Sequence, residues 1–303
     1  MTGPGSYCSG GSEAANPPRE VLVKRLFTRI SEVSTLPAVA IRNVEVANDP
    51  ESEAADLLEV VEFDAALATR IIRTVNSSYY GLQNKVAELK LAITLLGFKE
   101  IRNLAMTAYI AQLFQQPARH AHYSREGLWN HLIGVGTVAK LIAETSKKVA
   151  PREAYLAGLL HDLGFILIDQ YLHKPFCKML DALKAEVPVL QVEDETLGFD
   201  HAELGAFVAE QWRLPKQLTT AIRYHHEPDR YQGEHSAMVY VVALANFFCH
   251  LKDLSSLGIS QTQKPPAEWF TALGLQKADV AWIWEHLDEV LEAADIMKLV
   301  HAA

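Results

Sequence analysis

The side chains of this 303-residue chain best suited to chemistry are histidines on otherwise apolar helix faces in its second half. His131, for example, shares a face with Leu128 and Val135 at the three-and-four spacing of a helix. Each member of a larger set follows this pattern, and we expect all of them to point inward: His131, His161, Asp162, His201, His225, His226 and Asn246.

Burial of this set predicts a metal site. One buried imidazole costs little free energy when it finds a hydrogen bond, so a lone inward histidine is commonly an ordinary core residue. A buried carboxylate costs more, and it requires a partner, a shifted pKa or a metal ion. Asp162 bridging two cations would have its charge compensated, and ligands from facing helices form such dinuclear sites. A purely structural polar network is the alternative hypothesis.

The types of donor atom limit which metals are expected to bind, but they do not identify a single one. The set is rich in imidazole, poor in carboxylate and free of thiolate, which suits Fe, Mn, Ni, Co or Zn. We therefore predict one or two transition-metal ions, with Asn246 as a weak ligand or a partner of a ligand.

The elements that must position this set are predicted to be helices. Asp49-Pro50 and Asp64 are typical helix starts, and Gly81 and Gly97 follow helical stretches. No alternating strand pattern of useful length occurs. The fold class is therefore all-α, a helical bundle of two packed sub-bundles. In the second half, helical runs are expected at 127–146, 152–163, 201–212, 215–226 and 236–252, with two more helices in 266–302.

Composition suggests where the chain divides. Residues 1–18 are rich in Gly, Ser and Pro and are predicted to be a disordered tail. A polar stretch at 115–124 separates an N-terminal helical subdomain, 19–118, from a subdomain with the candidate metal site, 119–255. Residues 256–303 are predicted to be C-terminal helices.

Charge and cysteine content exclude several classes of protein. The 28 Lys and Arg against 37 Asp and Glu give a net charge of −9, which argues against binding to a nucleic-acid backbone. Cys8, Cys177 and Cys249 are too few and too far apart for a disulfide framework, and they fit a reducing cytoplasm. No apolar run reaches about 18 residues, so we expect a soluble, cytoplasmic protein that does not enter a membrane.

The order His131, His161-Asp162, His201, His225-His226 resembles HD-superfamily phosphohydrolases, most closely the HD-GYP cyclic-dinucleotide phosphodiesterases. The resemblance implies that these residues are metal ligands, with the aspartate bridging and the second half HD-like. Three segments are similar to hallmark stretches of HDOD domains, which are HD-related output domains of bacterial signalling proteins. They are LPAVAIRNVEVANDP (36–50), FDAALATRIIRTVNSSYYGLQNKV (63–86) and AITLLGFKEIRNLAM (92–106).

Two departures from the HD-GYP pattern bear on catalysis. Phe165 stands where a phosphate-gripping lysine is expected, and Asn246 stands where the last metal-ligating aspartate is expected. The GYP tripeptide is also missing. The predicted set of metal ligands is therefore nearly complete, whereas the residues expected to bind the substrate phosphate are partly missing. Three side chains nearby in the sequence are candidates to bind the substrate phosphate instead: Lys174, His173 and Arg223. Ordinary solvated side chains are the simpler interpretation of all three.

Three functional hypotheses follow. The first is an HDOD-type signal-transduction or regulatory protein that binds metal, catalyses weakly or not at all, and has another signalling protein as its partner. The second is a metal-dependent phosphohydrolase acting on a nucleotide or cyclic dinucleotide, whose phosphoester would be the ligand. The third is a di-iron oxygenase. A partly closed site with Phe165 near its edge is expected for the first, and a wide cationic mouth for the second.

Overall fold

The computed structural model describes residues 19–33, 54–62, 64–77, 80–261 and 263–294, with short pieces at 42, 45–46 and 52. The predicted tail and the Asp49-Pro50 helix start lie outside these residues. The described part is all-helical apart from one two-stranded hairpin, as predicted. None of its helices is both long and apolar enough to cross a membrane.

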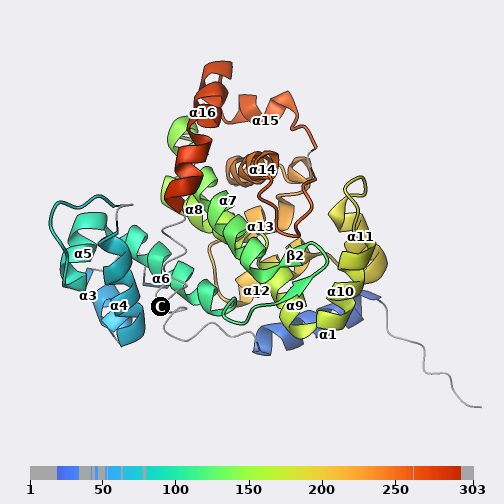
Figure 1. Cartoon of the computed structure of the whole chain (residues 1–303), viewed down its shortest axis with the longest axis horizontal. Helices are drawn as coiled ribbons and strands as arrows, with labels where there is room; N and C mark the ends of the chain where they lie inside the picture. The colour runs from blue at the N-terminus through green and yellow to red at the C-terminus, as the bar shows by residue number, and fades with distance from the viewer. Residues whose placement is uncertain are drawn as a thin grey trace, which may run out of the picture.

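A small group of helices forms one end of the molecule, and the remainder forms a larger body (Figure 1). The small end contains α3 (Ala54–Glu62), α4 (Ala65–Val75) and α5 (Leu89–Leu96), and α6 (Phe98–Gln112) connects it to the body. The body is built around α7 (Arg125–Ser146), α8 (Pro151–Leu160), α12 (His201–Gln211), α13 (Lys216–Tyr224) and α14 (Ser236–Leu251).

Shorter helices surround this central group. They are α9 (Leu163–Tyr171), α10 (His173–Ala182), α11 (Val189–Thr196), the 3-10 turn η1 (Pro228–Arg230), α15 (Ala267–Ala272) and α16 (Lys277–Ala294). The hairpin consists of β1 (Arg119–His120) and β2 (Tyr123–Ser124), which pair antiparallel directly before α7.

Helix ends follow the local chemistry of the sequence. The Asp64 carboxylate accepts a hydrogen bond from the Leu67 amide at 3.0 Å, and it caps α4 as predicted. Ser124 caps α7 in the same way. Gly81 and Gly97 adopt φ values of +57° and +83°, which glycine reaches without the steric cost that other residues incur. Gly97 separates α5 from α6, whereas α4 ends at Val75, with Asn76 as its cap, five residues before Gly81.

Glycines let two pairs of helices approach closely in the body. A Cβ atom added at Gly158 of α8 would lie 2.8 Å from the Cα atom of Gly136 in α7. One added at Gly164 of α9 would lie 2.0 Å from the carbonyl oxygen of His201, where α12 begins. Only a residue without a side chain fits at such distances, so these contacts bring Asp162, before α9, next to His201.

The first helix, α1 (Arg19–Val33), packs on α12 rather than on the small end. The Phe27 ring meets Phe199 edge-on at 5.0 Å between centroids and lies 5.6 Å from Phe207. In Figure 1, α1 is the blue helix below the body, away from α3 and α4. Residues from the start of the chain therefore complete the core of the metal-site half.

A buried network joins α6 to α8. Arg102, which has no exposed surface, forms an ion pair with Glu153 at 3.0 Å, and Lys99 lies 3.3 Å from the same carboxylate. The Asn103 amide donates to the carbonyl oxygen of Arg152 at 2.6 Å. Because His161 directly follows α8, these contacts connect the small end to the candidate metal site.

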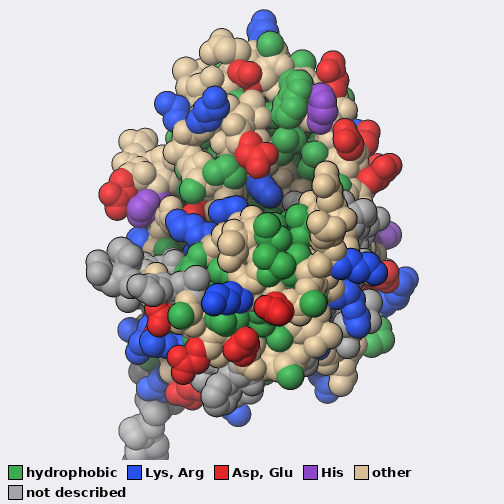
Figure 2. All heavy atoms as spheres, turned by 90° about the vertical axis from the view of Figure 1, so that its left-hand side faces the viewer, with side chains coloured by type: hydrophobic (Ala, Val, Ile, Leu, Met, Phe, Trp, Pro, Cys, Tyr) green, Lys and Arg blue, Asp and Glu red, His purple; other side chains and the backbone are tan. Residues whose placement is uncertain are grey.

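The face formed by α3, α4 and α5 carries hydrophobic side chains among charged ones (Figure 2). Leu91 and Leu95, one turn apart on α5, are 45% and 52% exposed. They belong to the hydrophobic pattern of α5 but face away from its buried side, where Leu89, Ala92 and Ile93 lie.

The predicted helix boundaries differ from the structure in three places. The helix expected at 152–163 is α8, which ends at Leu160; His161 and Asp162 follow it, and a second helix, α9, begins at Leu163 where the first was expected to stop. Residues 119–124 of the polar stretch form the hairpin. Helices α10 and α11 were not predicted. The apolar pattern of α11 is weak, since it buries only Val189 and Val192 among its apolar residues, whereas α10 does bury Phe176, Met179 and Leu180 at helical spacing.

Candidate metal centre

The predicted site residues come from five parts of the body, mostly at helix ends. His131 lies in the middle of α7, while His161 and Asp162 form the junction between α8 and α9. His201 opens α12, His225 and His226 directly follow α13, and Asn246 lies within α14. A helix end turns the chain, so adjacent residues such as His161 and Asp162 can both point at one centre.

Asp162 lies at the centre of the cluster. Its Oδ1 atom is 3.1 Å from Nε2 of His201 and 3.2 Å from Nε2 of His225. Its Oδ2 atom is 3.2 Å from Nε2 of His161 and 3.7 Å from Nε2 of His131. The two carboxylate oxygens therefore face two different pairs of histidines.

Two overlapping sets of donor atoms are compact enough to hold an ion. One contains His131, His161 and Asp162, and the other contains Asp162, His201, His225 and His226; within each, the atoms lie within 4.8 Å of one another. Asp162 belongs to both, which is the arrangement expected of a carboxylate between two cations. The described residues thus include a His/Asp group that could hold one or two metal ions.

The hydrogen bonds of the rings determine which nitrogen is free. Three histidines use Nδ1 to contact backbone carbonyl oxygens, which can only accept: His131 with Leu254 at 2.8 Å, His161 with Gly158 at 2.7 Å and His225 with Ile222 at 2.8 Å. Nδ1 must therefore carry the hydrogen, and Nε2 of the neutral ring presents a lone pair to the cluster. This is the tautomer that binds a metal through Nε2.

Glu193 on α11 fixes the orientation of His201. One carboxylate oxygen accepts from Nδ1 of His201 at 2.7 Å, and the other accepts from the His201 backbone amide at 3.0 Å. Both side chains are fully buried. A carboxylate behind a ligating histidine orients the ring and makes it a stronger donor. Sequence analysis missed Glu193, whose only local signal is its place eight residues before His201.

Burial and the neighbouring charges shift the pKa values of the cluster. Burial lowers the pKa of His131 and His226 well below the ordinary value, and it lowers that of His225 to about 4. Burial would raise the pKa of Asp162, but the His161 and His201 rings hold it well below its usual range. Asp162 therefore stays charged.

His201 is the exception among the histidines. Burial would lower its pKa, but Glu193 and Asp162 outweigh burial and raise it to about 10. The pKa of Glu193 is raised by burial in turn, although His201 opposes this. At a pKa of about 10 the His201 ring carries a proton on each nitrogen; a metal ion would displace the proton on Nε2, and the proton on Nδ1 would stay hydrogen-bonded to Glu193.

Unpaired polar atoms test whether the residues fit a metal. Asp162 Oδ1, His225 Nε2 and Asn246 Oδ1 are buried without a hydrogen-bond partner among the described residues. With the pKa of His225 at about 4, its Nε2 lone pair faces a carboxylate oxygen 3.2 Å away. Two acceptors in contact are unfavourable unless a cation lies between or beside them. The donor set therefore fits a bound metal.

The cluster opens onto a cavity of about 830 Å³. Asp162, His225, His226 and Asn246 line it, as does His250, which sequence analysis did not select. The His250 ring lies edge-on to His131 at 5.4 Å between centroids, and burial lowers its pKa. The apolar pattern of α14 did not point to His250, because this residue lies at the end of the helix.

Phe165 closes one side of the cluster. It is 1% exposed and stacks on the His201 ring, with 3.9 Å between centroids and 16° between planes. The expectation that Phe165 lies near the edge of the site agrees with its position, since it lines the cavity. The Phe165 ring therefore occupies the space beside His201, so a cationic side chain does not take that space.

The cavity wall carries charges of both signs. Arg230 donates to Glu227 at the mouth, and Lys264, Glu186 and Asp229 also line the cavity. The wide cationic mouth expected of a phosphohydrolase is therefore not formed by the described residues of this wall.

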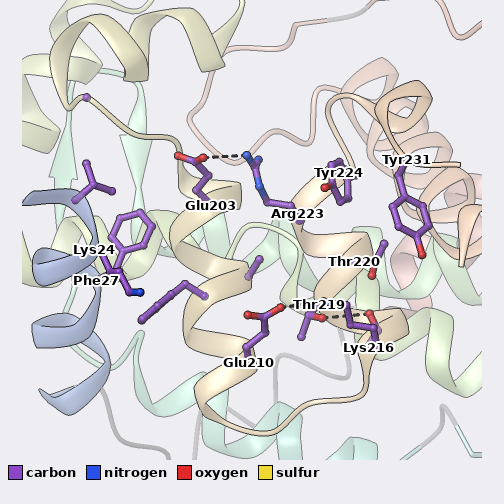
Figure 3. A pocket seen from close by; sticks show the side chains of 14 residues that line it. Lys24, Phe27, Glu203, Glu210, Lys216, Thr219, Thr220, Arg223, Tyr224 and Tyr231 are labelled. Atoms are coloured by element: carbon purple, nitrogen blue, oxygen red, sulfur yellow. Dashed lines mark hydrogen bonds and ion pairs between the residues drawn. The ribbon is translucent and has the colours of Figure 1, made fainter. Parts of the chain in front are cut away.

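The three side chains considered as replacements for a phosphate grip point elsewhere. Arg223 lines a second cavity, of about 1010 Å³, between α1 and the α12–α13 pair, and it donates to Glu203 at 2.9 Å (Figure 3). His173 bonds to Asp169 instead. Neither these residues nor Lys174 are among those that line the cavity of the metal cluster.

Comparisons with known proteins agree with this architecture. The HDOD domain family matches residues 33–228. A crystal structure of an HDOD domain protein of unknown function from Geobacter sulfurreducens is 26% identical, covers 91% of this chain and 99% of its own, and superposes with a TM-score of 0.74. One from Marinobacter aquaeolei VT8, described as a candidate signal transduction protein, is 23% identical, covers 94% and 65%, and has a TM-score of 0.76.

A curated relative gives the same match from sequence. An uncharacterized protein from Treponema pallidum (strain Nichols) is 25% identical over 235 residues, which are 77% of this chain and 45% of that protein. The chain thus spans less than half the length of the curated relatives that it matches. The family match covers well over half of the chain and includes every predicted ligand except Asn246, so this chain belongs to the HDOD domain family.

Proposed function

We propose that this chain is a regulatory HDOD protein of bacterial signalling type, in which the His/Asp cluster holds one or two transition-metal ions with weak or no catalysis. A metal that binds only the folded state stabilises it by mass action, so a complete ligand set does not require turnover. In this proposal the bound metal would hold together the helices that carry or flank its ligands, namely α7, α8, α9, α12 and α13. Another signalling protein would be the binding partner of the chain.

The observation that carries the proposal is the contrast between the ligands and their surroundings. The ligand nitrogens converge on Asp162, but Phe165 fills the side of His201 where a cation would grip phosphate. Arg230, the arginine at the mouth, is neutralised by Glu227. Phosphoester hydrolysis creates negative charge that positive groups must stabilise, and this cavity offers few.

The alternative function is a metal-dependent phosphohydrolase acting on a nucleotide or cyclic dinucleotide. The cavity of about 830 Å³ favours it, because that volume suits a small ligand and Asp162 lies in its wall. A bound metal would supply an activated water, and the chain would orient the ligands through Glu193 and the backbone carbonyls.

Elemental analysis of protein purified without added metal tests the proposal first. The variant His161→Ala, Asp162→Ala removes ligands from both halves of the cluster. The matched control His120→Ala, Asp181→Ala removes an exposed His–Asp pair, 2.7 Å apart, that lies away from the cluster. We expect one or two metal equivalents in the unaltered protein and the control, and loss in the ligand variant.

A hydrolysis screen on the same three proteins separates the two functions. Equal, background-level cleavage of phosphodiesters and cyclic dinucleotides by all three supports the regulatory function. Cleavage by the unaltered protein and the control, lost in the ligand variant, would establish the phosphohydrolase instead. Absence of metal from the unaltered protein, even after loading, would refute both and leave a buried polar network.

A further inference from the structure

A second group of reactive side chains lies outside the metal centre, where α9 is followed by α10. Asp169, His173 and Cys177 fall at intervals of four residues, and their side chains contact one another in that order. The proposed function uses none of them.

Asp169 is a fixed, charged anchor. Its carboxylate has no exposed surface, and it accepts hydrogen bonds from the Tyr123 hydroxyl at 3.0 Å and from the Arg125 guanidinium. The other carboxylate oxygen contacts Nδ1 of His173 at 2.7 Å. A buried carboxylate held by three donors cannot rotate away, so it fixes the orientation of the His173 ring.

The hydrogen bond to Asp169 determines the tautomer of His173. Asp169 accepts hydrogen bonds as the ion-pair partner of Arg125, and Nδ1 of His173 donates to its other oxygen. Nε2 then carries the free lone pair, and it lies 3.6 Å from Sγ of Cys177. A base that is oriented by a third group and faces a thiol is the arrangement that activates a nucleophile.

The thiol needs such a base. Partial burial raises the pKa of Cys177, and the Asp169 and Asp181 carboxylates raise it further. Thiolate is therefore scarce at neutral pH, although the thiolate is the nucleophile. His120 pairs with Asp181 and does not contact the thiol in the described structure. His173 is thus the proton acceptor available to Cys177.

We propose that Cys177 is a modification site that forms mixed disulfides with low-molecular-weight disulfides, with His173 as the base and Asp169 as the positioning residue. Sγ of Cys177 attacks one sulfur of the disulfide, and its proton passes to Nε2 of His173. The sulfur–sulfur bond of the reagent breaks, and the departing thiolate takes up that proton. One thiol and one disulfide are consumed, and one mixed disulfide and one thiol are formed.

Access distinguishes Cys177 from the other cysteine in the described part of the chain. Cys177 is partly exposed, and the His173 side chain is 54% exposed, so a small disulfide can reach the pair. Cys249 is fully buried, and burial raises its pKa, so it is expected to be inert.

The test follows the reaction of the full chain with oxidised glutathione, located by peptide mass spectrometry, in a Cys8→Ser background. We expect the mixed disulfide at Cys177 alone. The substitution His173→Gln removes the base, and it should slow the reaction by about 100-fold, the lower end of the range for a positioned general base. His120→Gln, which alters a neighbouring exposed histidine, should leave the rate unchanged.

The pH profile adds a readout that a merely structural role of His173 would not change. With His173 present, the base takes up the thiol proton during the attack, so the rate should depend less steeply on pH than it does without His173. In His173→Gln it should climb steadily toward the raised pKa of the thiol. Equal rates and equal profiles in the two proteins, or modification at Cys249 instead, would overturn the proposal.

Discussion

Substitution of Glu193 by glutamine tests whether the buried carboxylate behind His201 serves the metal centre. Glu193 accepts two hydrogen bonds from the same residue, one from the ring Nδ1 and one from the backbone amide. A glutamine side chain has one accepting oxygen and one donating amino group. One of the two donors of His201 would therefore face another donor.

The expected magnitude follows from this mismatch. Loss of a carboxylate partner behind a ligating histidine typically costs about 10- to 100-fold in metal affinity, which corresponds to about 1.4 to 2.7 kcal/mol. The cost should fall in the upper part of this range because both partners are fully buried and no water replaces the lost bond. The substitution also removes the carboxylate that raises the pKa of His201.

Competition with a chromophoric chelator measures the apparent metal affinity of Glu193→Gln beside the unaltered protein. Glu195→Gln is the matched control, because Glu195 lies on the same helix but is exposed and bonds only to Gln191 in the described structure. The control should retain metal as the unaltered protein does. If Glu193→Gln also binds metal with unchanged affinity while remaining folded, Glu193 has no part in orienting a ligand, and the reasoning from His201 fails.

Three further predictions concern stability. In chelator-treated protein, the pKa of His225 is lowered to about 4, so the protein should lose stability as the pH falls below 6.5. The pKa of His201 is raised to about 10, so its contribution to stability is complete below pH 6.5 and is lost as the pH rises toward 10. Urea midpoints should therefore peak near the unshifted histidine pKa of 6.5, and a flat profile would contradict the two shifts. Gly164→Ala should destabilise by about 1 to 3 kcal/mol and weaken metal retention, since its Cβ would meet the carbonyl of His201; an unchanged melting temperature would show that α9 and α12 can separate freely. Arg102→Ala should cost about 3 to 5 kcal/mol, because the buried Glu153 carboxylate keeps only the half-exposed Lys99 of the two cations described beside it; Arg102→Met with Glu153→Leu should recover most of this cost, as measured by urea unfolding.

The sequence predicts the helices and the ligands for the same physical reason. A long helix buried on one face repeats apolar residues every three or four positions, so α7, α12 and α14 were visible as patterns. A polar residue that interrupts such a face stands out against it. His131 and His201 were selected on this basis, and the structure places both within 4 Å of Asp162.

What the sequence could not supply are contacts that depend on three-dimensional proximity. Glu193 looks like any surface glutamate of a short, polar segment, and only the fold of α11 brings it behind His201. His250 has an equally weak local signal. The pairing of Asp169 with Tyr123 joins residues 46 positions apart, and no periodicity encodes it. The helix end near His161 and Asp162 was expected, but the start of α9 at Leu163 was not, because the apolar run continues across the junction.

The docking of α1 on α12 has a consequence for any shortened form of the protein. The small end formed by α3, α4 and α5 lies in the chain between α1 and the body, so it is an insertion into the metal-site half rather than a separate leading domain. A truncation that starts after α6 would remove Phe27 and expose Phe199 and Phe207 to water. A minimal fragment that keeps the candidate metal centre intact must therefore retain residues 19–33, even though the His/Asp cluster itself begins at His131.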